Sequence, residues 1–404
     1  MRRDMNYQMI RDQLLAMAVP AGTEHVCLKK SMGRILAEPF AARENVPAFD
    51  RSPYDGFAFL AADSAEASEA HPVTLKIQEE IAAGMVPQKT VTPGTAAKIL
   101  TGAPIPGGAD TVVMYEKTRF TEDTVTLFQP AGSGSNIVYA GEDVEKGQVL
   151  AESGTKLDAG LIGTLAAQGI TEPLVYVKPC IGVLSTGSEV MDAGETVGAG
   201  KIRDSNRYML AAALHETGCD AEDLGLIRDH TKDIAARIEK GLTDCDALLI
   251  TGGVSAGDFD LTPAAMERAG ANVLCRGVDI KPGMACAYGE KGGKFIFALS
   301  GNPASAMTNF YVVVWPVLRK LAGCREFLPQ EFPVTLAEDF PKKSPRTRFL
   351  RGKLDLSDGT VRMHLSARQG NAVLSSAIGC DGMAMIPAGS GPIPGGTRLK
   401  GFRI

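Results

Sequence analysis

The chain has 404 residues, of which 45% are hydrophobic and 22% are charged, and its formal net charge at pH 7 is −5. This length exceeds one ordinary hydrophobic core, so we expect a folded globular protein with several domains. Lys and Arg form no cluster that is free of acidic residues, and the longest apolar run, FYVVVWPVL, is too short for a bilayer, which argues against nucleic-acid binding and membrane insertion.

The first half of the chain predicts one helix followed by short strands. The stretch MRRDMNYQMIRDQLLAMAVP spaces its apolar residues as an amphipathic helix does, not as the core of a signal peptide, so we expect a cytoplasmic protein. Pro, Asp and Gly residues near 47–56 mark a boundary. From there to about residue 140, alternating runs such as VTLKIQEEI predict a small β-rich domain, and residues 142–176 predict a strand pair and a helix.

The second half predicts an α/β domain and a further β domain. From Cys180 to Gly323, strand patterns such as DALLITGG alternate with helix patterns such as TKDIAARIEKGLT, and PASAMTNFYVVVWPVLRKLAG is expected to be one long helix. This alternation is typical of a mostly parallel sheet between two helix layers. Short strands and turns return after residue 328. The predicted fold is therefore a central three-layer α/β domain, flanked by β-rich N-terminal domains and a small barrel-like C-terminal β domain.

Eight cysteines lie far apart in the sequence, and none of them forms a CxxC pair. Such spacing is typical of reduced thiols in a core, and it does not suggest a disulfide framework or a zinc site. The eight are Cys27, Cys180, Cys219, Cys245, Cys275, Cys286, Cys324 and Cys380.

Polar and acidic residues follow three predicted strands of the α/β domain. In parallel sheets, ligands bind at the carboxyl ends of the strands. Here three segments contain such a strand end and the polar residues after it: GVLSTGSE, GLIRD and LLITGGVSAGDFD. Glycines permit positive φ and leave amides bare to bind an anion, as helix N-termini also do. The residues concerned are Thr186, Gly187, Ser188, Glu189, Asp229, Gly252, Gly253, Ser255, Asp258 and Asp260.

Carboxylates beside a phosphate would repel it unless a divalent cation lay between them, and Mg²⁺ is usually held by one or two carboxylates and phosphate oxygens. We therefore expect a site for phosphate and Mg²⁺. The alternative is that Glu189 and Asp260 are helix caps or solvated loop acids. A fourth loop, ALSGNPAS, carries Gly301, Asn302 and Pro303, which suit the start of a helix at the same face of the sheet.

Eight segments in order along nearly the whole chain resemble the motifs of the MoeA family of molybdopterin molybdenumtransferases, which includes the gephyrin E domain. They are SPYDGFAF, TGAPIPGGADTVVMYE, GEDV, LSTGSEV, IRDSNRYML, TGGVSAGDFD, IKPGMACAYG and SGNPAS. The resemblance implies an enzyme that takes adenylylated molybdopterin and molybdate, cleaves the pyrophosphate link in a Mg²⁺-dependent step, and releases AMP and molybdenum cofactor. It also implies an elongated linker and dimerisation domain (1–45 and 142–176), a β-rich domain (46–141), an α/β domain that binds molybdopterin (177–327) and a C-terminal β domain (328–404).

The resemblance assigns roles to individual residues. The catalytic acids are Asp55, Glu189, Asp229 and Asp260, of which Glu189, Asp229 and Asp260 hold the metal. The residues that bind the adenylylated molybdopterin are Thr101, Thr186, Gly187, Gly252, Gly253, Ser255, Asn302 and Pro303. The residues expected at the molybdate are Lys281, Ser300, Arg351, Ser375 and Ser376. Asp143 also falls on a motif position. The alternative for Arg351 is a surface arginine on a strand.

Three positions depart from the family pattern: Ser300 stands where proline is usual, Val138 where arginine is common, and Asn371 where serine is common. They leave the preference between molybdate and tungstate open. The resemblance further implies a homodimer in which Asp55 and Thr101 act in trans, with the molybdopterin adenylyltransferase and molybdoenzyme chaperones as possible partners. Two other functions remain open at this point: the preceding adenylyl transfer to molybdopterin, and a binding or scaffold protein without catalysis.

Overall fold

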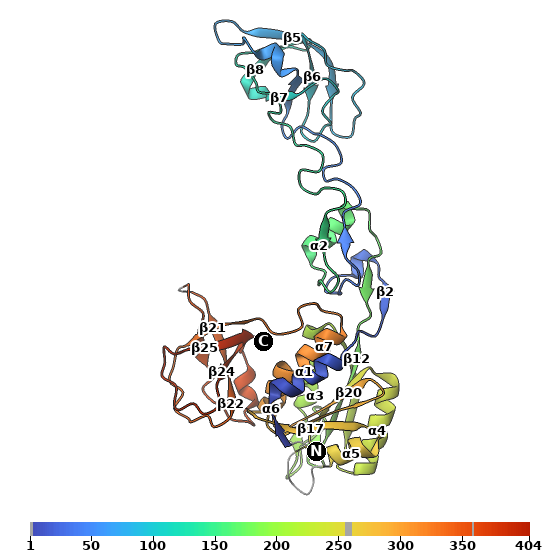
Figure 1. Cartoon of the computed structure of the whole chain (residues 1–404), viewed down its shortest axis with the longest axis vertical. Helices are drawn as coiled ribbons and strands as arrows, with labels where there is room; N and C mark the ends of the chain where they lie inside the picture. The colour runs from blue at the N-terminus through green and yellow to red at the C-terminus, as the bar shows by residue number, and fades with distance from the viewer. Residues whose placement is uncertain (1–2, 255–260, 358) are drawn as a thin grey trace. The chain divides into compact units, whose positions relative to one another are not determined.

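A computed structural model describes residues 3–254, 261–357 and 359–404. The chain divides into two compact units, which we describe separately (Figure 1). The first unit comprises Met1–Glu38, Ser153–Ile162 and Glu172–Ile404, and the second comprises Pro39–Glu152 and Gly163–Thr171. The four-domain boundaries expected from the sequence stay a prediction.

A seven-stranded sheet forms the centre of the first unit. Its strands, in spatial order, are β1 (Arg3–Met5), β17 (Asn272–Val278), β19 (Cys286–Lys291), β20 (Lys294–Leu299), β16 (Ala247–Thr251), β12 (Cys180–Thr186) and β15 (Asp220–Ile227). The four strands from β20 to β15 are parallel, whereas β19 is antiparallel to both of its neighbours. The expected mostly parallel sheet is confirmed, and all five residues of β16 are buried, as in a strand covered on both faces.

Helices cover both faces of this sheet, which gives the predicted three layers (Figure 1). One face carries α1 (Tyr7–Met17), α3 (Asn206–Leu214), α6 (Pro303–Asn309) and α7 (Trp315–Leu321), and the other carries α4 (Thr231–Asp244) and α5 (Thr262–Arg268). The predicted long helix is interrupted by a π-helical turn, Phe310–Val314, between α6 and α7. Pro316 follows that turn and has no N–H to continue the α-helical pattern.

The C-terminal region of the first unit is a small β-barrel, as predicted. Its strands are β21 (Glu331–Leu336), β22 (Thr347–Asp355), β23 (Arg362–Leu365), β24 (Gly382–Ile386) and β25 (Arg398–Arg403), and the pairing of β22 with β24 closes the five strands. β18 (Ile280–Lys281) adds to the edge of β22. The barrel packs against α1, where the Tyr7 and Phe349 rings meet edge to face with centroids 5.6 Å apart.

The second unit is β-rich. Its six-stranded sheet has the order β7 (Thr111–Met114), β4 (Gly56–Phe59), β6 (Thr95–Ile99), β5 (Val73–Ile81), β9 (Thr124–Leu127) and β8 (Thr118–Phe120). The remaining short strands of the chain are β2 (Thr23–His25) with β11 (Leu174–Tyr176), β3 (Phe40–Ala41) with β10 (Val149–Ala151), and β13 (Val190–Met191) with β14 (Ile202–Arg203). The helix α2 (Ala159–Ala167) spans the point where the chain passes from the first unit to the second.

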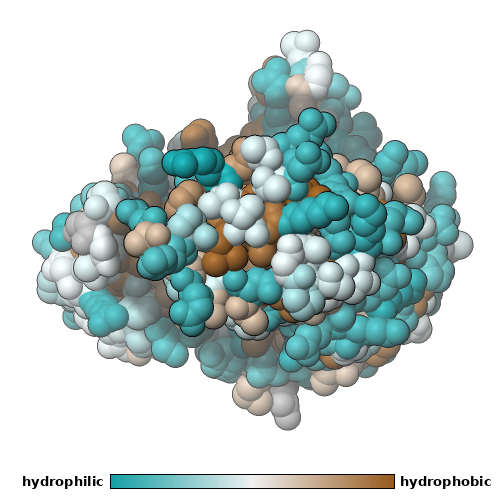
Figure 2. Space-filling model, turned by 90° about the horizontal axis from the view of Figure 1, so that it is seen from above, coloured by the Kyte–Doolittle hydropathy of each residue, from teal (hydrophilic) through white to brown (hydrophobic). Residues whose placement is uncertain are grey.

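All eight cysteines are free, as the sequence predicts. Five of them are buried, and Cys180 and Cys380 are partly buried, but Cys27 is exposed, so the expected core position is wrong for Cys27. The face shown in Figure 2 is mostly hydrophilic, and its hydrophobic residues gather near the centre. Within the described part of the chain, no helix is both long enough and apolar enough to pass through a bilayer.

The close approach of β4 and β7 predicts a steric effect at Gly56. A Cβ at this position would lie 2.0 Å from the Val113 carbonyl oxygen, so Gly56→Ala should lower the free energy of unfolding by about 3 kcal/mol. Gly163→Ala is the matched control, since it adds a Cβ on α2 with no atom within 4 Å and should raise the free energy of unfolding by about 0.5–1 kcal/mol. Urea unfolding measures both, and equal stability of the two variants would contradict the predicted clash.

Candidate functional site

A cleft of about 600 Å³ lies at the carboxyl ends of the parallel strands. Its walls come from the segments that follow β12, β15, β16 and β20, from the start of α3, and from Ala372 and Leu374 near the barrel. The cleft is where the sequence placed a ligand site. Nine residues predicted at the site line it: Thr186, Gly187, Glu189, Asp229, Gly252, Gly253, Ser300, Asn302 and Pro303. Ser255, Asp258 and Asp260 lie outside the described residues.

Asp229 lines the cleft and is held by two hydrogen bonds. One carboxylate oxygen accepts a hydrogen bond from Thr186 Oγ1 at 2.7 Å, and the other accepts one from the Ser188 amide at 2.8 Å. Because β15 and β12 are neighbours in the sheet, the acid after one strand bonds the turn after the other. These two bonds fix the orientation of the carboxylate.

Glu189 lies in the same turn, with its carboxylate over Gly187. A Cβ built on Gly187 would lie 3.2 and 3.3 Å from the two carboxylate oxygens of Glu189. Glu189 precedes β13 and caps no helix, so the capping alternative does not hold for this acid. Its side chain is exposed and makes no hydrogen bond with any described residue, which leaves both oxygens available to a ligand.

Two carboxylates in the cleft fit Mg²⁺ in the way this ion is usually bound. The described residues contain no group of three or more His, Cys, Asp or Glu side chains that could hold a metal ion, so they form no complete protein cage. Mg²⁺ commonly keeps its waters and binds one or two carboxylates together with substrate phosphates. The donor set of Glu189 and Asp229 is therefore adequate for Mg²⁺ that arrives with a phosphate ligand.

The paired glycines after β16 are required by protein packing. Gly252 has φ +103°, and a Cβ there would lie 2.1 Å from the Thr186 carbonyl oxygen. Gly253 has φ +61°, and its Cβ would lie 2.6 Å from Thr262 Oγ1. The Gly252 amide donates to the Leu299 carbonyl at 3.0 Å, so it is not a bare amide. The sequence argument, that the glycines let a ligand approach the backbone, missed this contact between strand ends.

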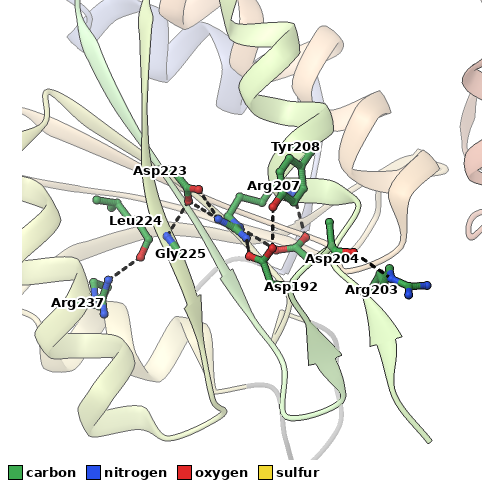
Figure 3. A network of polar contacts seen from close by, with 10 residues as sticks. Asp192, Arg203, Asp204, Arg207, Tyr208, Asp223, Leu224, Gly225 and Arg237 are labelled. Atoms are coloured by element: carbon green, nitrogen blue, oxygen red, sulfur yellow. Dashed lines mark hydrogen bonds and ion pairs between the residues drawn. The ribbon is translucent and has the colours of Figure 1, made fainter. Parts of the chain in front are cut away.

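The start of α3 is anchored by a buried arginine (Figure 3). Arg207 is only 4% exposed, and its guanidinium contacts Asp192, Asp204 and Asp223. Burial opposes the charge of Arg207, but hydrogen bonds to Asp223 and Asp204 outweigh it and raise the pKa of the guanidinium. Three residues that line the cleft, Asp204–Asn206, directly precede this anchor, so the network sets the position of one cleft wall.

Arg351 is a fully buried cation to which no described residue offers a carboxylate. Its exposed fraction is 0%, Nε donates to Ser376 Oγ at 3.1 Å, and one terminal nitrogen lies 3.4 Å from the Gly370 carbonyl oxygen. The other terminal nitrogen, Nη1, has no hydrogen-bond partner among the described residues. Burial lowers the pKa of Arg351, but arginine stays charged at neutral pH. The alternative of a surface arginine is therefore wrong.

The segment between Gln369 and Ala377 connects Arg351 to the cleft. Gly370 and Ser376 of this segment bond Arg351. Ala372 and Leu374 line the cleft. The Asn371 carbonyl accepts from the Ala304 amide at the start of α6, at 3.1 Å. Asn371, one of the positions that depart from the family pattern, thus bonds through its backbone carbonyl, which a serine at this position would also supply.

The other residues predicted at the molybdate lie in different settings. Ser300 lines the cleft, and its Oγ accepts from the Asn302 amide at 3.2 Å. Ser375 is exposed and takes no part in the contacts of Arg351. Lys281 is exposed on β18, where its register partner on β22 is Arg348 and not Arg351.

Asp55 and Thr101 meet in the second unit. One Asp55 oxygen accepts from the Thr101 amide at 2.7 Å and from Thr101 Oγ1 at 2.8 Å, and these bonds lower the pKa of Asp55. Burial, followed by the charges of Asp55 and Glu80, raises the pKa of Tyr115 to about 12. Asp143 and Val138 also belong to this unit, and Val138 pairs with Arg51 through the backbone alone.

Three cleft features were missed by sequence reasoning. Asn206 and Ser185 line the cleft, and Arg207 anchors its wall. Asn206 and Arg207 stand in the IRDSNRYML motif, which was used only for the resemblance. Ser185 is the penultimate residue of β12, and the period-2 pattern of a strand could have placed it on the same face as Thr251.

The bonds from Thr101 predict a pH effect at Asp55. Because the folded-state pKa of Asp55 is lowered, its stabilising effect is present above its ordinary value near 3.8 and is lost as the pH falls through the lowered value. Thr101→Val removes one of the two bonds, so the pKa of Asp55 should rise toward 3.8. Carboxyl ¹³C NMR titration measures it. Asp63 is the reference carboxylate, and an unchanged Asp55 pKa would contradict the assigned cause.

Comparison with known proteins agrees with this fold. Three family models match in order: the MoeA N-terminal region (domain I and II) at residues 5–169, a probable molybdopterin binding domain at 182–320, and the MoeA C-terminal region (domain IV) at 333–400. A molybdopterin molybdenumtransferase of Bacillus subtilis is 37% identical over 388 residues, 94% of this chain and 89% of the relative. One from Staphylococcus aureus is 37% identical over 376 residues, 92% of this chain and 88% of the relative.

The solved structures agree with the sequence relatives. A molybdopterin biosynthesis MoeA protein from Pyrococcus horikoshii has a TM-score of 0.86 at 32% identity, with 100% of both chains covered. A molybdenum cofactor biosynthesis protein from Pyrococcus furiosus shares the fold, with a TM-score of 0.61 at 20% identity and 100% of both chains covered. The chain therefore belongs to the MoeA family and is a transferase of molybdenum cofactor biosynthesis.

Proposed function

We propose that this enzyme is a molybdenum insertase, which cleaves adenylylated molybdopterin, inserts molybdate, and releases AMP and molybdenum cofactor. The observation that carries the proposal is the buried guanidinium of Arg351, whose Nη1 has no hydrogen-bond partner among the described residues. One short segment links it to the cleft, which is lined by the acids Glu189 and Asp229. A buried cation without an anion is costly, so this position suits an anionic ligand. The cleft and Arg351 together supply separate places for a phosphate with its metal and for an oxyanion.

The phosphate part of the substrate is assigned to the turns after β12 and β16. Thr186, Gly187, Gly252 and Gly253 form these turns, and Asn302 and Pro303 open α6 at the same cleft. Glu189 and Asp229 would hold Mg²⁺, with Asp260 as the third acid from outside the described residues. When bound, the metal would neutralise phosphate charge and polarise the pyrophosphate link. Asp229 would keep its orientation through Thr186 and Ser188.

The oxyanion is assigned to Arg351 and Ser376. Arginine offers parallel N–H donors to a tetrahedral oxyanion, and the free Nη1 of Arg351 is such a donor. The remaining expected contributors, Lys281, Ser300 and Ser375, would complete the path of molybdate. Tungstate has the same shape and charge, so these contacts do not separate the two ions.

We further propose a cytoplasmic homodimer in which Asp55 and Thr101 act on the partner's substrate. The support is that these two residues form a preorganised polar pair in a unit separate from the one that carries the cleft. Mixing Asp55→Ala chains with Asp229→Ala chains should restore AMP release. No recovery in the mixture would contradict the shared arrangement. The adenylyltransferase of the preceding step and molybdoenzyme chaperones are the proposed protein partners.

The first test is AMP release from adenylylated molybdopterin with Mg²⁺ and molybdate. Asp229→Asn keeps the shape of the side chain but loses the charge, so AMP release should fall by about 100-fold or more, as for loss of a group that stabilises transition-state charge. Asp244→Asn, an exposed acid on α4, is the control and should keep full activity.

AMP release, ATP turnover and substrate binding together separate the alternative functions. Release that needs Mg²⁺ and molybdate supports the insertase. ATP turnover with molybdopterin in the absence of molybdate would instead indicate the adenylyltransferase, and tight binding without cleavage would indicate a scaffold.

A second prediction concerns the oxyanion. Arg351→Met removes a buried charge while keeping a similar length, so the KM for molybdate should rise about tenfold, which corresponds to about 1.4 kcal/mol. The free energy of unfolding should stay equal or rise, because replacing a buried charge by an apolar group is often neutral or stabilising. Arg348→Met is the matched control: this buried arginine of β22 already bonds Ser344 and lies over the Phe340 ring. Equal KM changes in both variants would argue against the assignment.

A further inference from the structure

Asn206 joins three loops at the inner wall of the cleft. Its side-chain Nδ2 donates to Thr251 Oγ1 at 2.8 Å and to the Gly301 carbonyl oxygen at 2.9 Å. A carbonyl oxygen can only accept, so the nitrogen must face Gly301 and the amide cannot be turned over. This fixes the position of the other amide atom, Oδ1.

Oδ1 of Asn206 is a buried acceptor that receives no hydrogen bond from the described residues. Asn206 is 5% exposed and lines the cleft, and none of the described residues gives Oδ1 a hydrogen bond. Buried acceptors are normally paired. A group that enters the cleft with an N–H or O–H can supply the missing bond.

A second unpaired polar atom lies in the same part of the cleft. Ser185 is 2% exposed and lines the cleft, and its Oγ also lacks a partner among the residues described. Ser185 and Thr251 are register partners on β12 and β16, and Thr251 accepts from Asn206. The hydroxyls and the amide therefore form one neutral polar corner.

The Asn206 oxygen disfavours a phosphate beside it. The carbonyl-type oxygen of Asn206 would repel phosphate oxygens, which are also acceptors. The acids Glu189 and Asp229 lie beyond β12, in the turn region, where a phosphate and its cation fit. The cleft is thus divided into a region for charge and a corner for a neutral donor.

We propose that Asn206 is a specificity-determining residue, whose Oδ1 accepts a hydrogen bond from the exocyclic amine of the substrate's heterocycle. This rests on the proposed function, whose substrate carries two such amines, one on adenine and one on the pterin. Both heterocycles place the amine beside a ring nitrogen, and the Ser185 hydroxyl is able to donate to a nitrogen acceptor. A site that pairs a substrate N–H discriminates strongly against an analogue that lacks it.

The test uses two pairs of ligands, and the members of each pair differ at the amine. Titration calorimetry compares AMP with purine riboside 5′-monophosphate, and pterin-6-carboxylate with lumazine-6-carboxylate. The full chain should prefer the amine-bearing member of one pair by about tenfold, which corresponds to about 1.4 kcal/mol. The pair that shows the preference identifies the heterocycle at Asn206.

Two variants complete the cycle. Asn206→Leu removes Oδ1, so the preference should fall to about onefold. Thr251→Val breaks one bond of the Asn206 amide but leaves Oδ1 in place, so it should change both affinities of a pair and keep their ratio. If Asn206 had only a structural role, Asn206→Leu would lower the affinity for both members of a pair equally and leave the preference unchanged.

The outcomes decide the proposal separately from the proposed function. Equal affinities within both pairs for the unmodified chain, or a preference that survives Asn206→Leu, would overturn it. The comparison in the unmodified chain holds even if Asn206→Leu fails to fold. AMP release without any amine preference would contradict the role of Asn206 and support the insertase. An amine preference without AMP release would support the role of Asn206 and contradict the insertase.

Discussion

The site depends on how closely the strand ends of the parallel sheet approach one another. At Gly252 the backbone after β16 comes so near the Thr186 carbonyl that a Cβ would lie 2.1 Å from it. Thr262 then bonds the Gly252 carbonyl at 2.9 Å. This packing brings the turns after β12 and β16 side by side, and the loop after β20 joins them through the Gly252 amide. Polar groups that are far apart in the sequence therefore meet at one cleft.

Two buried arginines in the first unit show opposite ways of holding a charge. Arg207 contacts three aspartates, so its charge is balanced within the chain and it serves to fix the start of α3. Arg351 is buried as deeply, but within the described part of the chain its guanidinium bonds only a hydroxyl and a carbonyl. A buried pair mainly stabilises a geometry, whereas a buried unpaired cation leaves attraction available for an anion. The first arrangement suits a scaffold, and the second suits a ligand.

The polar groups of the cleft also differ in which of their hydrogen-bonding atoms are already used within the protein. Asp229 is oriented by two donors on neighbouring turns, whereas Glu189 is left exposed and open. Asn206 Nδ2 donates to Thr251 and Gly301, whereas its Oδ1 has no donor among the described residues. Charged and neutral polar contacts can therefore be made in one cleft without competing for the same atoms.

The sequence alone determined the fold class, the β-rich flanks, the reduced cysteines and the family, because strand and helix periodicities and the order of loop motifs are local properties. It also determined that acids stand at the ends of parallel strands, since that follows from the sheet type. Only the tertiary structure decided that Gly252 and Gly253 pack against Thr186 and Thr262. It alone decided that Arg351 Nη1, Asn206 Oδ1 and Ser185 Oγ are buried without a hydrogen-bond partner among the described residues. Burial and hydrogen-bond satisfaction depend on segments distant in the chain, and no local pattern records which neighbours they will meet.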